Sequence, residues 1–133
     1  MTDAVLDASA ILAWLQDEPG KDVVEDVMTN RTCLVSSVNV CEVISKLAER
    51  GAEREAILEA LAAMRFVNSD FGAADALEAG LLRPTTRGLG LSLADRACLA
   101  LAIRLDLPVL TTDRAWAALP LPIAVTIARP AEN

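Results

Sequence analysis

Short apolar runs alternate with longer helical segments along this chain, and the alternation restricts the folds that it can adopt. The apolar runs lie at residues 4–6, 33–35, 66–67, 108–110 and 123–127. Helical spacing of apolar residues lies between them, at residues 11–15, from about 21, and at 38–50, 53–64, 73–82, 95–102 and 114–119. Strands that alternate with helices predict an α/β fold, with a parallel sheet covered by helices on both faces.

The chain shows no internal repeat and no linker, so we expect one domain over residues 1–133. Hydrophobic residues make up 53% of it and aromatic residues only 3%, which predicts a core of aliphatic side chains and alanine. No apolar run approaches the roughly 20 residues that a membrane span needs. The first residues, MTDAVLDASA, do not resemble a secretory signal. Three cysteines without CxxC spacing favour a reducing, cytoplasmic location.

Histidine and tyrosine are both absent, and this excludes several kinds of catalysis. Neither a Ser–His–Asp nor a Cys–His site can be built, and a catalytic zinc site is disfavoured. Any hydrolysis would therefore depend on carboxylates, a metal ion, or both. The 19 acidic residues outnumber the 12 basic ones, which gives a net charge of -7. Such a surface is poorly suited to non-specific binding of nucleic acid.

Acidic residues occur where the predicted strands end. Asp7 follows the first apolar run, and Asp113 follows the run at 108–110. Asp95 lies in the first turn of a helix, and Glu42 lies near the start of another. The carboxyl ends of parallel strands meet at one edge of a sheet, where ligands bind in open α/β folds. These side chains therefore form a candidate site.

Each of these acids also has a structural explanation. Asp7, Ser9 and Asp113 could cap helices. Glu42 precedes Lys46 by four residues, the favoured orientation for a surface ion pair. Asp95 follows Ser92 by three residues, as in a capping box.

Asp95 is harder to explain as a cap alone, because the rest of its helical face is apolar through Cys98, Leu99 and Ala102. An ionised carboxylate that faces a dry interior costs several kcal/mol unless it is compensated. No lysine lies near it in the sequence, and Arg96 points about 100° away on a helix. A divalent cation would compensate several such carboxylates together.

Four stretches resemble the motifs of PIN-domain nucleases. They are VLDASAILAWL with Asp7, SSVNVCEVISKL with Glu42, LSLADRACLALA with Asp95, and LPVLTTDRAWA with Asp113. They extend from Leu6 to Trp116 and follow the order of the family's motifs. The size and the motifs are most similar to those of the VapC-type ribonuclease toxins of bacterial toxin–antitoxin pairs.

The resemblance implies a PIN-like, doubly wound α/β fold with a mostly parallel sheet flanked by helices. It also implies an endoribonuclease that binds Mg²⁺ or Mn²⁺ through the four acids, with hydroxyls that support them and arginines that contact phosphates of the RNA substrate. The supporting hydroxyls would be those of Ser9 and Thr111 or Thr112, and the arginines Arg96 and Arg114, although surface charge explains these arginines equally well.

The expected partners are a cognate antitoxin and a second copy of the chain in a homodimer. The antitoxin would lie across a groove formed by the early helices. Trp14 either lines that groove or belongs to the core. An alternative function is a non-catalytic PIN-like interaction domain, in which the acids remain only as caps. Two other α/β classes fit less well. A response-regulator receiver needs a late lysine, and the last lysine here is Lys46; a haloacid-dehalogenase-type phosphatase needs an aspartate where this chain has Ser9.

Overall fold

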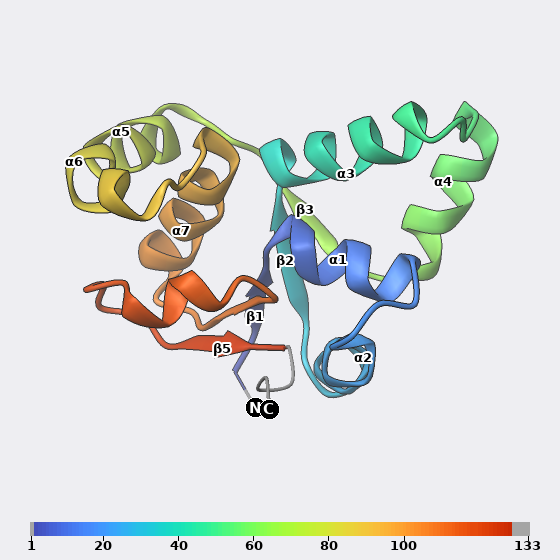
Figure 1. Ribbon diagram of the computed structural model, residues 1–133, viewed down its shortest axis with the longest axis horizontal. Coiled ribbons are helices and arrows are strands. Elements are labelled where there is room, and N and C mark those ends of the chain that lie inside the picture. Colours follow the sequence, from blue (N-terminus) through green and yellow to red (C-terminus); the bar gives the residue numbers. More distant parts are fainter. Residues whose placement is uncertain (1, 129–133) are drawn as a thin grey trace.

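A computed structural model describes residues 2–128. Its centre is a five-stranded sheet in the order β3-β2-β1-β4-β5, in which all neighbouring strands are parallel (Figure 1). The strands are β1 (Ala4–Leu6), β2 (Cys33–Ser36), β3 (Val67–Ser69), β4 (Val109–Thr111) and β5 (Val125–Ile127). The predicted α/β class with a mostly parallel sheet is confirmed.

The strand order reverses between β1 and β4. The chain builds outward from β1 through β2 to β3, and then crosses to the other side of β1 to form β4 and β5. Val5 pairs with Val109 and Leu6 with Leu110. The loops that leave β1 and β4 therefore diverge from neighbouring positions at the carboxyl edge, which is where doubly wound sheets bind ligands.

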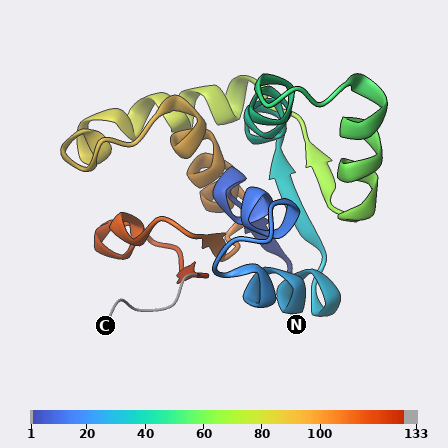
Figure 2. The ribbon, with the colours of Figure 1, turned by 45° about the vertical axis from the view of Figure 1, so that its right-hand side comes forward.

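Helices cover both faces of the sheet (Figures 1 and 2). They are α1 (Ala8–Leu15), α2 (Lys21–Asn30), α3 (Ser37–Glu49), α4 (Arg54–Ala63), α5 (Ala73–Leu81), α6 (Arg83–Thr86) and α7 (Leu93–Leu105), with 3-10 turns η1 (Arg87–Leu89) and η2 (Arg114–Ala118). None of the helices in residues 2–128 combines the length and apolar character needed to cross a membrane.

Successive strand residues point to opposite sides of the sheet and fill two separate cores. Leu6 and Leu110 pack with residues of α1, α2 and α3 in one core. Val5 and Val109 pack with α7 and Trp116 in the other. Both faces of the central strands are thus buried, which explains why the strands read as continuous apolar runs rather than as alternating ones.

The polar segment from Thr85 to Gly88 is helical and not an irregular loop. It lies in α6 and η1. Pro84 lies in the first turn of α6, where proline is tolerated because its missing N–H would have no partner in the helix. The backbone N–H and the hydroxyl of Thr86 both donate to the carbonyl oxygen of Leu82, at 3.0 and 2.8 Å.

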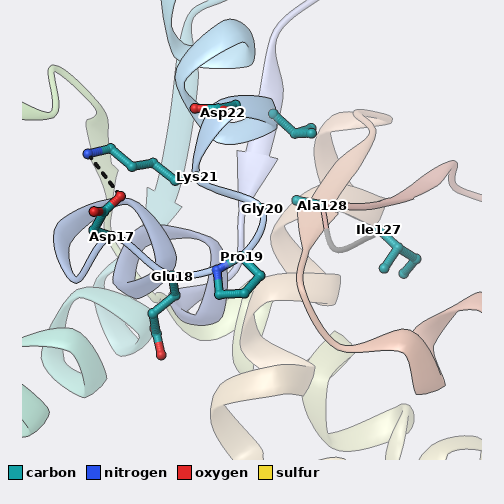
Figure 3. A pocket seen from close by; sticks show the side chains of 9 residues that line it. Asp17, Glu18, Pro19, Gly20, Lys21, Asp22, Ile127 and Ala128 are labelled. Atoms are coloured by element: carbon teal, nitrogen blue, oxygen red, sulfur yellow. Dashed lines mark ion pairs between the residues drawn. The ribbon is translucent and has the colours of Figure 1, made fainter. Parts of the chain in front are cut away.

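Gly20 connects α1 to α2 and touches the end of β5. Its φ is 102°, in the left-handed region that favours glycine. A Cβ at this position would lie 1.8 Å from the carbonyl oxygen of Ala128. Figure 3 shows the close approach of the two residues, beside the ion pair of Lys21 with Asp17 at 3.5 Å. Glycine here allows the loop after α1 to pack against the last strand.

We predict that Gly20→Ala destabilises the fold more than Gly51→Ala. Gly51 also has a positive φ, of 96°, but a Cβ there would meet nothing within 4 Å. The Gly51 variant should cost about 1–2 kcal/mol of backbone strain. The Gly20 variant should cost a further ~1–3 kcal/mol, because the carbonyl group of Ala128 must move. Urea unfolding of both variants measures the difference, and equal losses would contradict the proposed contact.

Candidate active site

Asp7 is the most deeply buried of the four candidate acids, with 3% of its surface exposed. It lies between the last residue of β1 and the first residue of α1. Its backbone N–H donates to the carbonyl oxygen of Leu110 at 3.0 Å, which continues the pairing of β1 with β4. The two central strands therefore fix the position of this carboxylate at the point where the strand order reverses.

Two hydroxyl groups hold one oxygen of Asp7. Ser9 Oγ and Thr111 Oγ1 donate to Asp7 Oδ2 at 2.7 and 3.0 Å. In turn, Ser9 Oγ accepts from the backbone N–H of Thr112 at 3.0 Å, and Thr111 Oγ1 accepts from that of Asp113 at 3.1 Å. The network ties the end of β1 to the loop after β4. It also distinguishes the two threonines, since Thr111 acts through its hydroxyl and Thr112 through its backbone.

The other oxygen of Asp7, Oδ1, is buried without a hydrogen-bond partner. Burial raises the pKa of Asp7 from its ordinary value of 3.8 to about 6. The hydrogen bond from Ser9 opposes this rise, the charge of Asp95 adds to it, the bond from Thr111 opposes it, and the charge of Glu42 adds to it. The ionised form of Asp7 is thus destabilised by its surroundings, and its Oδ1 can still accept a bond.

Asp95 is half-buried at the start of α7 and does not face the dry interior that the sequence suggested. It forms a complete capping box with Ser92. Asp95 Oδ2 accepts from the backbone N–H of Ser92 at 2.9 Å, and the backbone N–H of Asp95 donates to Ser92 Oγ at 3.1 Å. The apolar positions that follow Asp95 are buried in the core, and the helix start itself reaches the edge of the sheet. The cap uses one carboxylate oxygen and leaves Oδ1 outside it.

Glu42 is half-buried one turn into α3. Burial raises its pKa, the charge of Lys46 lowers it and the charge of Asp95 raises it. Glu42 and Lys46 do not form an ion pair within 4.0 Å in the described structure. Asp7, Glu42 and Asp95 also all raise the pKa of the buried Cys98 thiol, beyond the larger effect of its burial. The three acids therefore share one region of the site.

Asp113 lies at the rim of this region. Its side chain is exposed and caps η2, with Oδ1 accepting from the backbone N–H of Ala115 at 3.0 Å. Its link to Asp7 runs through its own backbone N–H and Thr111 Oγ1. As the side chains stand, residues 2–128 contain no group of three His, Cys, Asp or Glu side chains close enough to hold a metal ion together.

The chain matches one known protein family over most of its length. The family model for the PIN domain matches residues 4–121. The chain belongs to the PIN-domain family. The resemblance found in the four sequence motifs is therefore confirmed. A comparison with curated proteins gave no match.

Solved structures with the same fold cover nearly the whole PIN domain. A DNA-bound VapBC complex from Salmonella typhimurium aligns with a TM-score of 0.75 at 21% identity, over 96% of this chain and 99% of that one. FitAcB from Neisseria gonorrhoeae aligns with a TM-score of 0.67 at 21% identity, over 94% of this chain and 97% of that one. VapC20 from Mycobacterium tuberculosis, described as a Sarcin-Ricin loop cleaving toxin, aligns with a TM-score of 0.73 at 14% identity, over 90% of this chain and 96% of that one. At sequence identities of 21% and below, these matches show that the chain shares the fold of these proteins.

Asn39 is a residue of the site that the sequence analysis did not single out. It is fully buried on α3, one turn before Glu42. Its Nδ2 donates to the carbonyl oxygen of Ala94 at 2.9 Å, next to Asp95, and its Oδ1 has no partner. It thus joins the start of α3 to the start of α7 and sets the positions of Glu42 and Asp95. In the sequence, the sign that Asn39 belongs to the site was its position three residues before Glu42, on the same helical face.

The two arginines suggested for phosphate contact differ in their surroundings. Arg96 Nη1 donates to the carbonyl oxygen of Ala79 on α5 at 3.0 Å, and its Nε is buried without a partner. This places the guanidinium between α7 and α5, where it has a structural role. Arg114 is half-buried and begins η2 directly after Asp113. Phosphate contact by either residue stays a prediction.

We predict that Asp7→Asn stabilises the metal-free PIN domain at neutral pH. Folded Asp7 has the higher pKa, so it holds its proton more tightly than in the unfolded chain, and stability falls as pH rises from about 4 to 6. A rise of this size corresponds to at most roughly 3 kcal/mol. The asparagine variant lacks this loss, while its amide oxygen can still accept from Ser9 and Thr111.

Thermal melts in EDTA should therefore show the variant melting higher than the wild type at pH 7.5 and no higher at pH 4. Asp70→Asn, which removes an exposed carboxylate, is the matched control and should show no such crossover. A variant of Asp7 that melts lower than the wild type at pH 7.5 would contradict the electrostatic account.

Proposed function

We propose that this PIN domain is a metal-dependent endoribonuclease and the toxin of a toxin–antitoxin pair. The observation that carries the proposal is the state of Asp7. One of its oxygens is held by two hydroxyls, the other is buried without a partner, and the charges of Glu42 and Asp95 act on it. Family membership and the fold shared with VapC-type proteins, one of them described as an RNA-cleaving toxin, support the same function.

The donor set suits Mg²⁺ or Mn²⁺, because the acids offer only oxygen ligands and the chain lacks histidine. Asp7 Oδ1 is the acceptor that has no other role, so it fits a cation ligand. Asp95 and Glu42 would hold the ion with it, and Asp113 would hold it from the rim. A bound ion of this kind lowers the pKa of water and stabilises the charge that grows on a phosphate.

The residues of the chain supply orientation and electrostatics. Ser9 and Thr111 fix Asp7 Oδ2 and so direct Oδ1. Asn39 holds the start of α7 against α3 and so sets Asp95 beside Glu42. Under this proposal water would be the nucleophile, because an ion held by the acids would supply it in activated form. Hydrolysis by water leaves a 5′-phosphate and a 3′-hydroxyl at the cut.

A non-catalytic interaction domain is the second candidate function. Two of the acids have complete structural roles, since Asp95 closes the capping box with Ser92 and Asp113 caps η2. Under this alternative, the charge of Asp95 is not needed once the cap is retained. RNA cleavage by the purified chain separates the two functions.

We predict that the purified chain cleaves RNA with Mg²⁺ or Mn²⁺ and stops in EDTA, and that Asp95→Asn lowers the rate about 100-fold or more. Asparagine keeps an oxygen for the N–H of Ser92 but loses the charge. Ser92→Ala is the matched control, because it breaks the cap at a cost of about 1 kcal/mol and keeps the carboxylate. It should melt lower and still cleave at nearly the wild-type rate.

The ends of the products give a separate check on the mechanism. We expect 5′-phosphate and 3′-hydroxyl ends, identified by mass spectrometry of the fragments. A 2′,3′-cyclic phosphate, or full activity in excess EDTA, would refute the metal-dependent route. An Asp95→Asn variant that melts lower but cleaves at the wild-type rate would leave Asp95 as a cap only.

A groove between α1, α2 and the end of α4 suits the expected antitoxin. It has a volume of about 260 Å³ and is lined by Trp14, Glu25, Met28, Thr29, Ala63, Met64 and Arg65. Trp14 packs partly against the core, and its Nε1 is buried without a partner. A partner segment could offer this indole an acceptor and cover the apolar floor. The two interpretations of Trp14 are therefore compatible.

The homodimer that we also propose would use the opposite end of the molecule. Leu77 and Leu81 lie one turn apart on α5 and are 62% and 63% exposed. Large apolar side chains that share an exposed helical face often mark a protein contact.

We predict that Thr29→Arg weakens the complex with the cognate antitoxin by about tenfold or more, which is roughly 1.4 kcal/mol. Thr29 lines the groove at its exposed side, so a long side chain there blocks the groove without entering the core. Asn30→Arg is the matched control, since it introduces the same side chain one residue away, outside the groove. Calorimetry measures both, and equal affinities would exclude this groove as the binding site.

A further inference from the structure

A second pocket adjoins the acidic site and has no role in the mechanism so far. Its volume is about 190 Å³. Ser9 and Thr112, which belong to the network around Asp7, line it together with Gln16, Lys46 and Arg50. Pockets for whole drug-sized ligands measure about 300–1,000 Å³, so this pocket has room for one group of a larger substrate.

Lys46 and Arg50 continue the helical face that carries Glu42. Glu42 and Lys46 lie on α3, and Arg50 caps its carboxyl end. The three residues follow each other at intervals of four, and four residues advance a helix by about 6 Å. An acid at the site is thus followed by two cations at successive steps away from it. The charge of Lys46 is close enough to lower the pKa of Glu42. Both cations are exposed, and neither belongs to an ion pair within 4.0 Å in residues 2–128.

We propose that this pocket is a subsite for a backbone phosphate of single-stranded RNA, next to the phosphate that is cleaved, and that Lys46 and Arg50 bind it. The inference rests on the function proposed above and adds the contact that positions the substrate. Leu12 and Ala13 give the pocket an apolar floor, which suits the sugar beside the phosphate. Glu18 lines the same pocket and opposes the anion, so its charge limits the affinity.

RNA fits this pocket better than an acidic segment of a protein partner does, because the pocket opens onto the residues that orient Asp7. A chain that crosses the acidic site must continue past Ser9 and Thr112. The alternative explanation for the two cations is that they interact with the carboxyl end of α3, where positive charge stabilises a helix. That role affects the melting temperature, whereas a subsite affects the KM for RNA.

The test measures cleavage of a susceptible oligoribonucleotide with Mn²⁺. The double variant Lys46→Gln/Arg50→Gln should raise KM about tenfold or more and leave kcat within about twofold. The control Arg54→Gln/Arg83→Gln removes the same charge from exposed positions on α4 and α6, and should change KM little. Glu18→Gln should lower KM, which is the opposite sign within the same pocket. The slope of log KM against log salt concentration should become shallower by about 0.7 for one lost phosphate contact.

A substrate series locates the contact. Neutral methylphosphonate linkages are placed one at a time on either side of the cleaved bond. In the wild type, one position should raise KM about as much as the double variant does, and in the double variant that substitution should have no further effect. Such non-additivity shows that the protein and the phosphate act on each other.

Several results would overturn the subsite. A double variant with the wild-type KM, an equal effect of the control, or additive effects of variant and methylphosphonate would each exclude it while RNA cleavage remains. Loss of partner binding with unchanged RNA kinetics would assign the pocket to a protein. A wild-type chain that cleaves no RNA under any of these conditions overturns the proposed function, and the subsite with it.

Discussion

The hydrogen bonds from Ser9 and Thr111 to one oxygen of Asp7 are the interaction on which the site depends. Burying an unpaired carboxylate costs several kcal/mol. Each of the two hydrogen bonds to this charged acceptor offsets about 1.5–3 kcal/mol of that cost. The offset is incomplete, because burial still raises the pKa of Asp7 to about 6 and its Oδ1 has no partner. The fold thus keeps a carboxylate that a cation can stabilise, and the contact of β1 with β4 holds it in place.

A structural role and a functional role need not compete for the same acid. The sequence set capping against metal binding for Asp95, and the structure contains the complete capping box. The box uses Oδ2 only, however, and it fixes the rotation of the whole carboxylate at the start of α7. Asp113 caps η2 in a similar way through its Oδ1. Capping therefore orients these acids at the edge of the sheet, which is a condition for a site rather than an argument against one.

The sequence predicted what depends on local pattern, and missed what depends on distant partners. Apolar runs and helical spacing located the five strands and most helices. The runs at the central strands β1 and β4 are continuous because both faces of these strands are buried. Local patterns did not order the strands, so the sequence could not show whether the hydroxyl of Thr111 or of Thr112 reaches Asp7. In the fold β4 lies beside β1, and the hydroxyl of Thr111 donates to Asp7. Asn39 was missed because Ala94, its partner, lies 55 residues away. The sequence placed Asp95 in the interior because the helical face that follows it is apolar. That face is buried only farther along α7, and the first turn, with Asp95, is half-exposed.

The net charge of -7 conflicts with RNA binding only if charge is averaged over the molecule. At physiological salt, interactions between exposed charges fade beyond a Debye length of about 8 Å. Lys46 is one helical step of about 6 Å from Glu42, and Arg50 is a second step farther on. A phosphate bound between the two cations would lie within that range of both. The acids on distant faces, such as those of α2, act mainly by weakening non-specific association. A globally acidic surface with a few local cations therefore favours an RNA strand that is held at chosen phosphates over one that is held anywhere on the surface.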